Sequence, residues 1–321
     1  MSQPPNIDGV LIQWGDRLFY PGNRVVKTKP QPKLSGLAAR QRAAAIRERI
    51  EATVVRRVPQ DMVKVTGGGR GMKAIAAHLR YISKNGRLEI EDERGETTRG
   101  KEALRELADD WRFGGSLIED VSDRREAFNI MLSMPRGTDP VTVQWAAREF
   151  ANAELVDHKY VMVLHDHQAN PHVHISVRAE SKHGKRLNPR KTDLHRWRET
   201  FAEKLRERGV EAEATRQATR GNSRNYDPLW RIKAREDGRL RTIRSSTKAS
   251  AGAQATRAQS VEAWMRVGQA LARSSEPADR KLASSIARFV QEMPAPQALS
   301  RQTGGPSRTA PDQFRETGLQ R

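Results

Sequence analysis

The sequence predicts an α+β fold, with a central antiparallel sheet flanked by helices and with basic extensions at both ends. Between residues 61 and 221, short apolar runs of strand character alternate with segments of helical period. Adjacent strands there are joined by short connections, which favours antiparallel pairing. We therefore expect a basic N-terminal extension over residues 1–60, a compact domain over 61–221, and a basic, partly disordered tail over 222–321.

The N-terminal extension has only weak sequence signals of secondary structure. The run from Val10 to Tyr20 reads as a short strand, and a stretch rich in proline and lysine follows it. From Leu37 to Ile50 the sequence is rich in alanine and arginine, which gives high helix propensity but a weak apolar face. We expect a solvated helix there, or an arm that lies on DNA.

The compact domain reads as alternating strands and helices. Ile75, Leu79 and Ile82 share one face of a helix that Gly86 ends. Charged residues at 93–96 indicate a hairpin. The expected strands are 62–65, 127–134, 160–165 and 172–177, and the expected helices are 72–85, 101–111, 141–155 and 194–208. The motif GGGRG, which precedes the first of these helices, is either a backbone nest for a phosphate or a flexible turn.

The tail is rich in serine, threonine, glutamine and alanine, and we expect disorder at its two ends. In its middle, Val261–Ala272 and Lys281–Met293 have helical patterns, the second with Leu282, Ile286 and Phe289 on one face. A helical hairpin is therefore predicted inside the tail.

Charge and composition restrict the partners. The chain of 321 residues has a formal net charge of +19 and no cysteine. This excess of positive charge is typical of proteins that bind a polyanion, so nucleic acid is the expected partner. Without cysteine, disulfides, thiolate zinc sites and a cysteine nucleophile are excluded, and any transition-metal site must use histidine. No apolar stretch approaches the roughly 18 residues of a membrane span, so we expect no membrane insertion and a cytoplasmic location.

Four of the eight histidines fall within ten residues, in LHDHQANPHVHISV. In a hairpin closed by residues 166–171, His165 lies opposite His172, and Val163 lies opposite His174. Opposed residues and residues two apart on a strand project from the same face, so His165, His172 and His174 share a face. Three imidazoles with open positions left over indicate a catalytic metal site. Isolated histidines are more often surface or core residues, but this spacing favours the metal site.

Tyr81 lies on a flank of the first expected helix, away from its buried stripe. A metal ion beside a basic surface suits phosphoryl transfer, because the cation neutralises charge that develops on a phosphodiester oxygen. Either water or a side chain could attack. From the residues alone, Tyr81 is a candidate nucleophile, and the alternative is a tyrosine that packs at the rim of the domain.

Three motifs in this order carry a family resemblance: HLRYISKNG, NIMLSMPRGTD and HDHQANPHVHISV. They resemble the motifs of mobilisation relaxases of the histidine–hydrophobic–histidine (HUH) endonuclease superfamily, specifically those similar to the Ti-plasmid border-cutting relaxase. The resemblance spans roughly residues 61–221. It implies that Tyr81 attacks the scissile phosphate and stays joined to the 5′ end, that Ser133 lies near the DNA, and that the three histidines bind the metal.

One departure from the family pattern concerns the third motif. Such relaxases commonly carry an aspartate two residues after the first histidine, whereas this chain has His167 there and Asp166 one position earlier. We assign Asp166 to orienting the ligands or to proton transfer, and the identity of the general base stays open. The resemblance implies Mg or Mn as the cofactor, while neutral imidazoles also suit Zn.

Basic residues around these motifs are the predicted DNA contacts, although a single charged residue is most often solvated surface. Trp145 and Trp197 could stack on bases, but core packing is the favoured role for both. The predicted contacts, besides Ser133, are Arg70, Lys73, Arg80, Lys84, Arg190 and Lys191.

These observations predict a DNA nickase that cuts and rejoins one strand at an origin of transfer. The resemblance adds relaxosome accessory proteins and a type IV coupling protein as partners. Two alternatives remain open: a rolling-circle replication initiator, which would share the chemistry, and a non-catalytic DNA-binding accessory protein.

Overall fold

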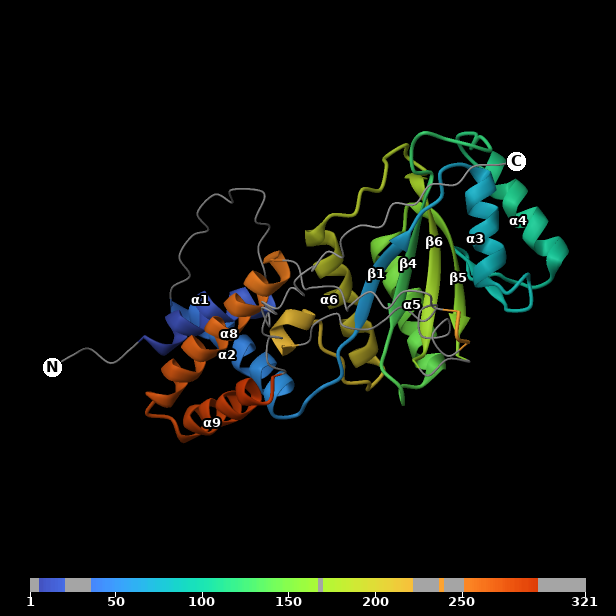
Figure 1. Ribbon diagram of the computed structural model, residues 1–321. Helices are drawn as coiled ribbons and strands as arrows, with labels where there is room; N and C mark the ends of the chain where they lie inside the picture. The colour runs from blue at the N-terminus through green and yellow to red at the C-terminus, as the bar shows by residue number, and fades with distance from the viewer. Residues whose placement is uncertain (1–5, 21–35, 167–169, 222–236, 240–250, 294–321) are drawn as a thin grey trace, which may run out of the picture.

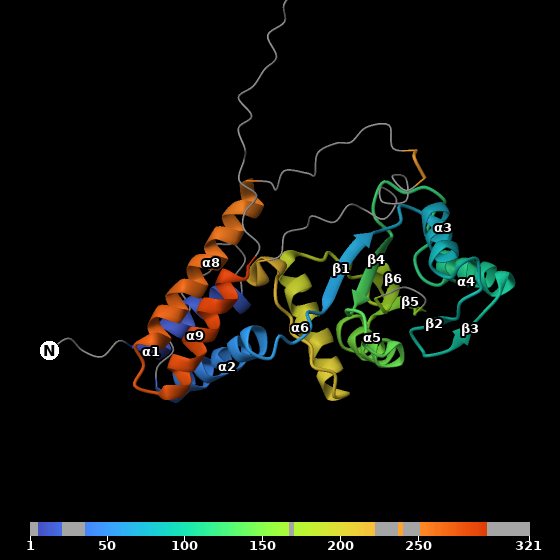
Figure 2. The same cartoon turned by 60° about the horizontal axis from the view of Figure 1, so that its bottom comes forward.

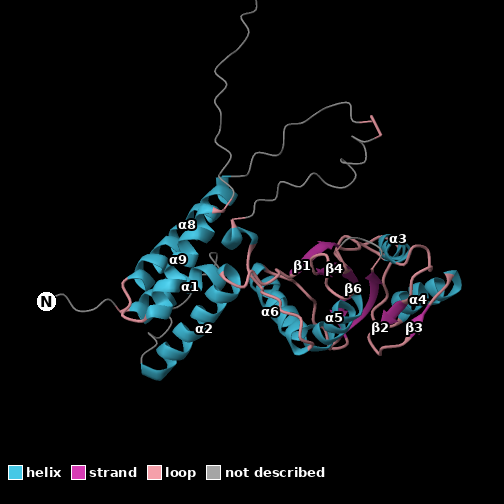
Figure 3. Ribbon diagram, turned by 90° about the horizontal axis from the view of Figure 1, so that it is seen from below, coloured by secondary structure: helices cyan, strands magenta, loops and turns pink. Residues whose placement is uncertain are grey.

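The computed structural model describes residues 6–20, 36–166, 170–221, 237–239 and 251–293 (Figure 1). They form a sheet domain and a helical unit that lie side by side (Figure 3). The predicted disorder at the two ends of the tail lies outside the described residues, apart from 237–239. The helices are α1 (Ile7–Phe19), α2 (Gly36–Val54), α3 (Met72–Ile82), α4 (Lys101–Phe113), α5 (Pro140–Glu154), α6 (Lys191–Glu207), the 3-10 turn η1 (Gln217–Arg220), α8 (Ala251–Ala272) and α9 (Pro277–Gln291).

The sheet has six strands in the order β1-β4-β6-β5-β2-β3, and all neighbours are antiparallel. The predicted α+β class with a central antiparallel sheet is confirmed. The hairpin expected at residues 93–96 is present as β2 and β3. The strand bounds are β1 (Met62–Gly67), β2 (Ile90–Asp92), β3 (Thr97–Thr98), β4 (Ala127–Ser133), β5 (His158–His165) and β6 (His172–Ser181).

Helices cover both faces of the sheet (Figure 2). On one face, Val173, Ile175 and Val177 of β6 pack in a core with α5 and α6. On the other face, α3 and α4 pack over β5, with Val161 and Val163 in their core. Because successive side chains of a strand point to opposite faces, the histidines of β6 lie on the α3 side.

The glycine motif before α3 is a close-packed turn rather than a phosphate nest. The backbone N–H groups of Met72 and Lys73 donate to the carbonyls of Glu119 and Asp120, at 2.8 and 3.2 Å. These are helix N-terminal donors that a phosphate would otherwise need. Gly71 has φ 91°, and a Cβ there would lie 2.4 Å from the Asp120 carbonyl oxygen. The motif therefore serves packing.

The helical unit combines both ends of the described chain. Helices α1, α2, α8 and α9 share one core, in which Trp264 is fully buried against Phe19 and Phe289. Helices α8 and α9 contain the two predicted tail helices and pack on each other. The tail hairpin is thus present, although it is part of a larger unit.

Two expectations for the N-terminal region are wrong. Residues 10–19 belong to helix α1, because Leu11, Gly15 and Leu18 recur at helical spacing and are buried in the helical unit. A Cβ on Gly15 would lie 2.5 Å from the Ile46 side chain, so the two helices approach closely. Helix α2 exists as predicted, but its inner face is buried in the helical unit rather than solvated.

Polar contacts join the helical unit to the sheet domain. Arg49 of α2 forms ion pairs with Glu199 of α6, at 2.9 Å, and with Glu213. The indole N–H of Trp264 donates to the carbonyl of Thr219 at 2.7 Å, and the Thr219 hydroxyl donates to the carbonyl of Leu18 at 3.0 Å. The segment that contains Thr219, which follows the sheet domain, is therefore bonded both to α1 and to α8.

No helix in the described part of the chain combines the length and apolarity that a membrane crossing requires. Trp197 is 1% exposed in the sheet core, and Trp145 packs against the same core under the guanidinium of Arg208. Core packing, the favoured role for both tryptophans, agrees with these positions.

Candidate active site

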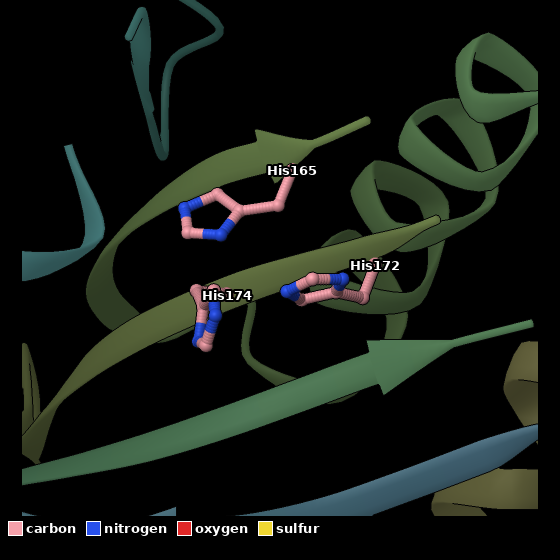
Figure 4. A group of neighbouring side chains, drawn as sticks. All are labelled: His165, His172 and His174. Atoms are coloured by element: carbon pink, nitrogen blue, oxygen red, sulfur yellow. The ribbon is translucent and has the colours of Figure 1, made fainter. Parts of the chain in front are cut away.

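Three histidines converge at one end of the sheet, on the face that carries α3. His165 ends β5 and pairs with His172 of β6, and Val163 pairs with His174, as the hairpin argument requires. The ring centroids are 4.6 to 5.0 Å apart, and the rings turn toward a common point (Figure 4). One nitrogen from each ring lies within 4.8 Å of the others. Of the described residues, only these three form a group with metal-binding geometry.

Backbone carbonyls hold two of the rings. His165 donates from Nε2 to the carbonyl of Ile82 at 2.6 Å, and His172 donates from Nδ1 to the carbonyl of Asn170 at 2.9 Å. A carbonyl oxygen can only accept, so these bonds place the lone pair of His165 on Nδ1 and that of His172 on Nε2. Such bonds fix the tautomer and orientation of metal-ligating histidines. The donor set therefore fits a divalent cation.

His174 lies in the middle of this cluster. Burial, followed by the neighbouring His165, His172 and His78, lowers the pKa of His174 to about 3. The ring is therefore neutral near pH 7, which is the form that binds a metal. Its buried Nδ1 has no hydrogen-bond partner within the described residues, so it is an unsatisfied polar atom that a cation would satisfy.

Tyr81 and His78 lie beside the histidines, on the last turns of α3. Tyr81 is 72% exposed, so its hydroxyl is accessible to a large substrate. The ring of His78 is 6.2 Å from the ring of Tyr81 and 6.5 Å from that of His174. Burial lowers the pKa of His78. His78 thus neighbours both the exposed phenol and the histidine cluster.

Ser133 lies across the sheet from the same cluster. It pairs with His172 between β4 and β6, so its side chain points to the same face. The Ser133 hydroxyl is buried and donates to the carbonyl of Pro171 at 3.2 Å. The backbone N–H of Arg136 donates to the Asn170 side chain at 3.0 Å. The loop after β4 therefore supports the turn whose carbonyl holds His172.

The comparisons with known proteins agree with this geometry. Residues 81–210 match the family model described as relaxase, MobA/VirD2-like, nuclease domain. The matched segment begins at Tyr81 and includes Ser133 and all three histidines. Residues 81–210 are therefore similar in sequence to this relaxase nuclease domain. The resemblance drawn from the three motifs is thereby confirmed.

One curated relative matches the sequence of the chain over part of its length. The chain is 26% identical over 174 residues to the T-DNA border endonuclease VirD2 of Rhizobium radiobacter. The matched part is 48% of this chain and 41% of the relative, so the chain spans less than half the length of this relative. The comparison therefore concerns a part of each protein and not the whole of either.

The predicted DNA contacts of the relaxase domain are spread over several places. Arg80 and Lys84 are exposed on either side of Tyr81 in the sequence. Arg70 and Lys73 lie at the opposite end of α3. Arg190 and Lys191 begin α6, whose buried residues pack on the other face of the sheet, so the structure does not bring them to the histidines. Contact of any of them with DNA stays a prediction.

Asp166 follows His165 directly and is exposed, and His167 lies outside the described residues. The carbonyls of Ile82 and Asn170 orient His165 and His172. The catalytic part assigned to Asp166 stays a prediction.

Sequence reasoning missed the position of His78. The signal was present, because His78 and Tyr81 are three residues apart and therefore neighbours on a helix surface. What the sequence did not contain is the packing of α3 over β5, which brings His78 to His174.

Proposed function

We propose that this protein is a DNA relaxase that nicks one strand at an origin of transfer and later rejoins it. Tyr81 is the nucleophile, and His165, His172 and His174 hold a divalent cation. The observation that carries the proposal is an exposed tyrosine beside three converging histidines, within a domain of the relaxase nuclease family.

The cation is supported by the donor set. Three neutral imidazoles, two of them oriented by carbonyls, suit Mn or Zn, and the family resemblance adds Mg. When bound, such a cation polarises a non-bridging oxygen of the scissile phosphate.

The reaction is a transesterification. The Tyr81 oxygen attacks phosphorus and forms a phosphotyrosyl bond, and the bond between phosphorus and the 3′ oxygen breaks. The phenol loses a proton to a base, and the 3′ oxygen gains one to become a free hydroxyl. Attack by that hydroxyl on the phosphotyrosyl bond reverses the step, so no external energy source is needed for rejoining.

Other residues of the domain have positioning roles in this proposal. Arg80 and Lys84, which flank Tyr81, would neutralise phosphates next to the scissile one. Ser133 keeps the Pro171 turn in place beside His172. His78, whose ring neighbours those of both Tyr81 and His174, would guide how the phenol approaches the cation.

The biological setting is proposed from the relaxase family. The nicked strand would leave the cell in conjugation, with relaxosome accessory proteins at the origin and a type IV coupling protein as the receiver. The basic tail would carry the signal that the coupling protein recognises. The relative VirD2 is named for cutting T-DNA borders, and the proposed substrate here is likewise a specific DNA site.

The test is covalent capture of DNA by the full chain. Fluorescent single-stranded oligonucleotides tiled across the DNA that flanks the gene are incubated with protein and Mg, Mn or Zn, and then separated on a denaturing gel. We expect a band in which oligonucleotide and protein migrate together. Tyr81→Phe should abolish this band, whereas Tyr160→Phe, a change at a buried tyrosine of β5, should retain it.

Two outcomes would favour the alternatives. If neither the wild type nor Tyr81→Phe forms an adduct with any ion, although both bind the oligonucleotides, the result would support a non-catalytic DNA-binding accessory protein. If an adduct forms but a tagged plasmid carrying the nicked site is not transferred to a recipient cell, the result would support a rolling-circle replication initiator.

A further inference from the structure

A groove separates α3 from α4 on the outer side of the helix that carries Tyr81. Two hollows, of about 560 and 210 Å³, meet there because both are lined by Ala76, Arg80, Ala108 and Asp109. We call this continuous feature the α3–α4 groove. It runs from Arg80 and Asn85, next to Tyr81, toward the start of α3 at Met72 and Lys73.

The end of the groove near Tyr81 is held in a defined shape. The backbone N–H of Gly100, which precedes α4, donates to the carbonyl of Gly86 at 2.9 Å. A Cβ on Gly86 would lie 2.4 Å from the Gly100 carbonyl oxygen, so the chain after α3 touches the start of α4. The Ser83 hydroxyl donates to the carbonyl of Leu79 at 2.7 Å and accepts from the Gly86 N–H at 3.0 Å. These contacts fix the spacing of α3 and α4 at the end of the groove that Arg80 and Asn85 line.

The floor of the groove is apolar and its walls are basic. Met72 and Leu104 are buried beneath it, with Ala76 and Ala108 between them. The lining contains two acids, Asp109 and Asp120. It also contains five cations, namely Lys73 and Arg80 from α3 and Lys101, Arg105 and Arg112 from α4. The excess of positive charge indicates an anionic occupant.

Some of these cations are already used within the protein. Arg112 pairs with Asp120, and Arg105 pairs with Glu102 at 3.0 Å, although both residues of the second pair are more than 70% exposed. An exposed pair of that kind contributes little and is easily exchanged for a phosphate. Within the described residues, Arg80 and Lys101 form no ion pair. At least three cations near the Tyr81 end, Arg80, Lys101 and Arg105, are therefore available to a ligand.

We propose that the α3–α4 groove holds the DNA strand on one side of the scissile phosphate, in single-stranded form. This rests on the proposed nicking function, which places the scissile phosphate at Tyr81, the residue after Arg80. A positively charged groove that follows the backbone is one of the means by which proteins bind single strands without reading sequence. A volume of about 560 Å³ is also in the range of roughly 300 to 1,000 Å³ that small-ligand sites show, which suits one nucleotide unit at a time.

The first test removes two cations from α4. Lys101 and Arg105 are four residues apart, so they share one helix face, and neither belongs to the proposed catalytic group. Binding of a fluorescein-labelled oligothymidylate to the full chain is measured over a range of salt. Each lost phosphate contact lowers the slope of log affinity against log salt by about 0.7, so the Lys101→Ala/Arg105→Ala variant should lose about 1.4.

The matched control removes two other exposed cations, Lys281 and Arg288 of α9, in the helical unit. Lys281→Ala/Arg288→Ala changes the net charge by the same amount, and we expect its slope to equal that of the wild type. Equal slopes in all three proteins would overturn the groove as a DNA site. Equal losses in both variants would overturn it too, because the effect would then come from net charge alone.

A second test uses the absence of cysteine in the chain. In an Ala108→Cys variant the groove floor carries the sole thiol, and an oligonucleotide with an activated mixed disulfide on one base can be trapped on it by thiol–disulfide exchange, which releases the activating thiol. We expect trapping at Ala108→Cys and none at Ser284→Cys, an exposed position of α9. No trapping at Ala108→Cys, with oligonucleotide bound, would overturn the proposal.

Failure of the groove and failure of the nicking function give different results. If slopes and trapping are unchanged from the control while Tyr81 still forms its covalent adduct, the groove proposal is wrong and the nickase proposal stands. If trapping and the slope change are seen but no adduct forms, the groove binds DNA and the nickase proposal is wrong.

Discussion

Metal binding by His165, His172 and His174 should raise the melting temperature of the protein. The perturbation is the addition of Mn, Zn or Mg to protein that has been stripped with a chelator. An ion that binds the folded state and not the unfolded state stabilises the fold by mass action. His172→Ala removes one of the three donors, so its melting temperature should respond far less.

The size of the effect follows from binding linkage and from the geometry of the site. At an ion concentration about 100 times the Kd, the stabilisation is about 2.7 kcal/mol. For a unit of roughly 150 to 250 residues, each kcal/mol shifts the melting temperature by about 2 to 4 °C, so the expected rise is about 5 to 11 °C.

Little of this stabilisation should be lost to rearrangement of the site. Two nitrogens bound to one tetrahedral ion at about 2.1 Å are about 3.4 Å apart. In the structure the ligand nitrogens lie within 4.8 Å of one another. The longest separation therefore closes by at most about 1.4 Å, which small side-chain rotations can supply.

The assay is thermal unfolding followed by circular dichroism, with the full chain and each ion in turn. His183→Ala is the control, because His183 is exposed and contacts Asp157 away from the cluster. His172→Ala must melt near the wild-type temperature in chelator, which shows that it folds. The metal assignment would be refuted if no ion shifts the wild type, or if His172→Ala shifts as much as the wild type does.

Three further predictions concern stability, each measured as the free energy of unfolding in denaturant. Trp264→Ala should cost about 3 to 5 kcal/mol, because it leaves a cavity between Phe19 and Phe289 and an unsatisfied Thr219 carbonyl; a loss below about 1 kcal/mol would contradict the packing. Gly71→Ala should cost about 1 to 3 kcal/mol, since φ there is 91° and the Asp120 carbonyl blocks a Cβ, and a neutral effect would show that the turn relaxes freely. At Asp279, burial opposes ionisation, but hydrogen bonds from Arg47 and Ser274 outweigh it and lower the pKa. Its contribution is therefore present above the unfolded-state pKa of about 3.9 and is lost as the pH falls through the lower folded-state pKa, so the difference between wild type and Asp279→Asn should shrink from about pH 6 to about pH 3. A difference that stays constant over that range would contradict the assignment.

The secondary structure of the sheet domain was predictable because its signals are local. Strand patterns predicted β1, β4, β5 and β6, charged residues indicated the hairpin of β2 and β3, and the register of β5 on β6 followed from the length of the loop. Helix α1 was misread, since its apolar residues include Leu11, Ile12 and Trp14 in near succession. Whether such a run forms a strand or a helix depends on the partner, here Ile46 across from Gly15.

The helical unit was not predictable as a unit. The pattern of α2 does not say that its alanine face will be buried by α1 and by α9, which comes from far along the chain. That outcome depends on contacts between residues more than 200 positions apart, such as Arg47 with Asp279. Local propensity carries no information on pairing at such a distance.

The same division applies to the site. The histidine cluster was predictable because its three members belong to one hairpin, in which pairing fixes the shared face. The side of the sheet on which the basic residues lie was not predictable, because positive charge in the sequence does not indicate a face of the sheet. Arg190 and Lys191 illustrate this, because α6 carries them on the side opposite the histidines.

One hydrogen bond links the two parts of the site that the sequence presents separately. The carbonyl of Ile82 lies in the last turn of α3, where helix carbonyls lack partners within the helix, and it accepts from His165 at 2.6 Å. Ile82 is the residue after Tyr81, so this bond sets both the tautomer of His165 and the position of the turn that carries the phenol. The histidine cluster and Tyr81 are therefore placed relative to each other before any DNA is bound. Loss of the His165 ring would change both at once, whereas loss of the His172 ring would change the histidine cluster alone.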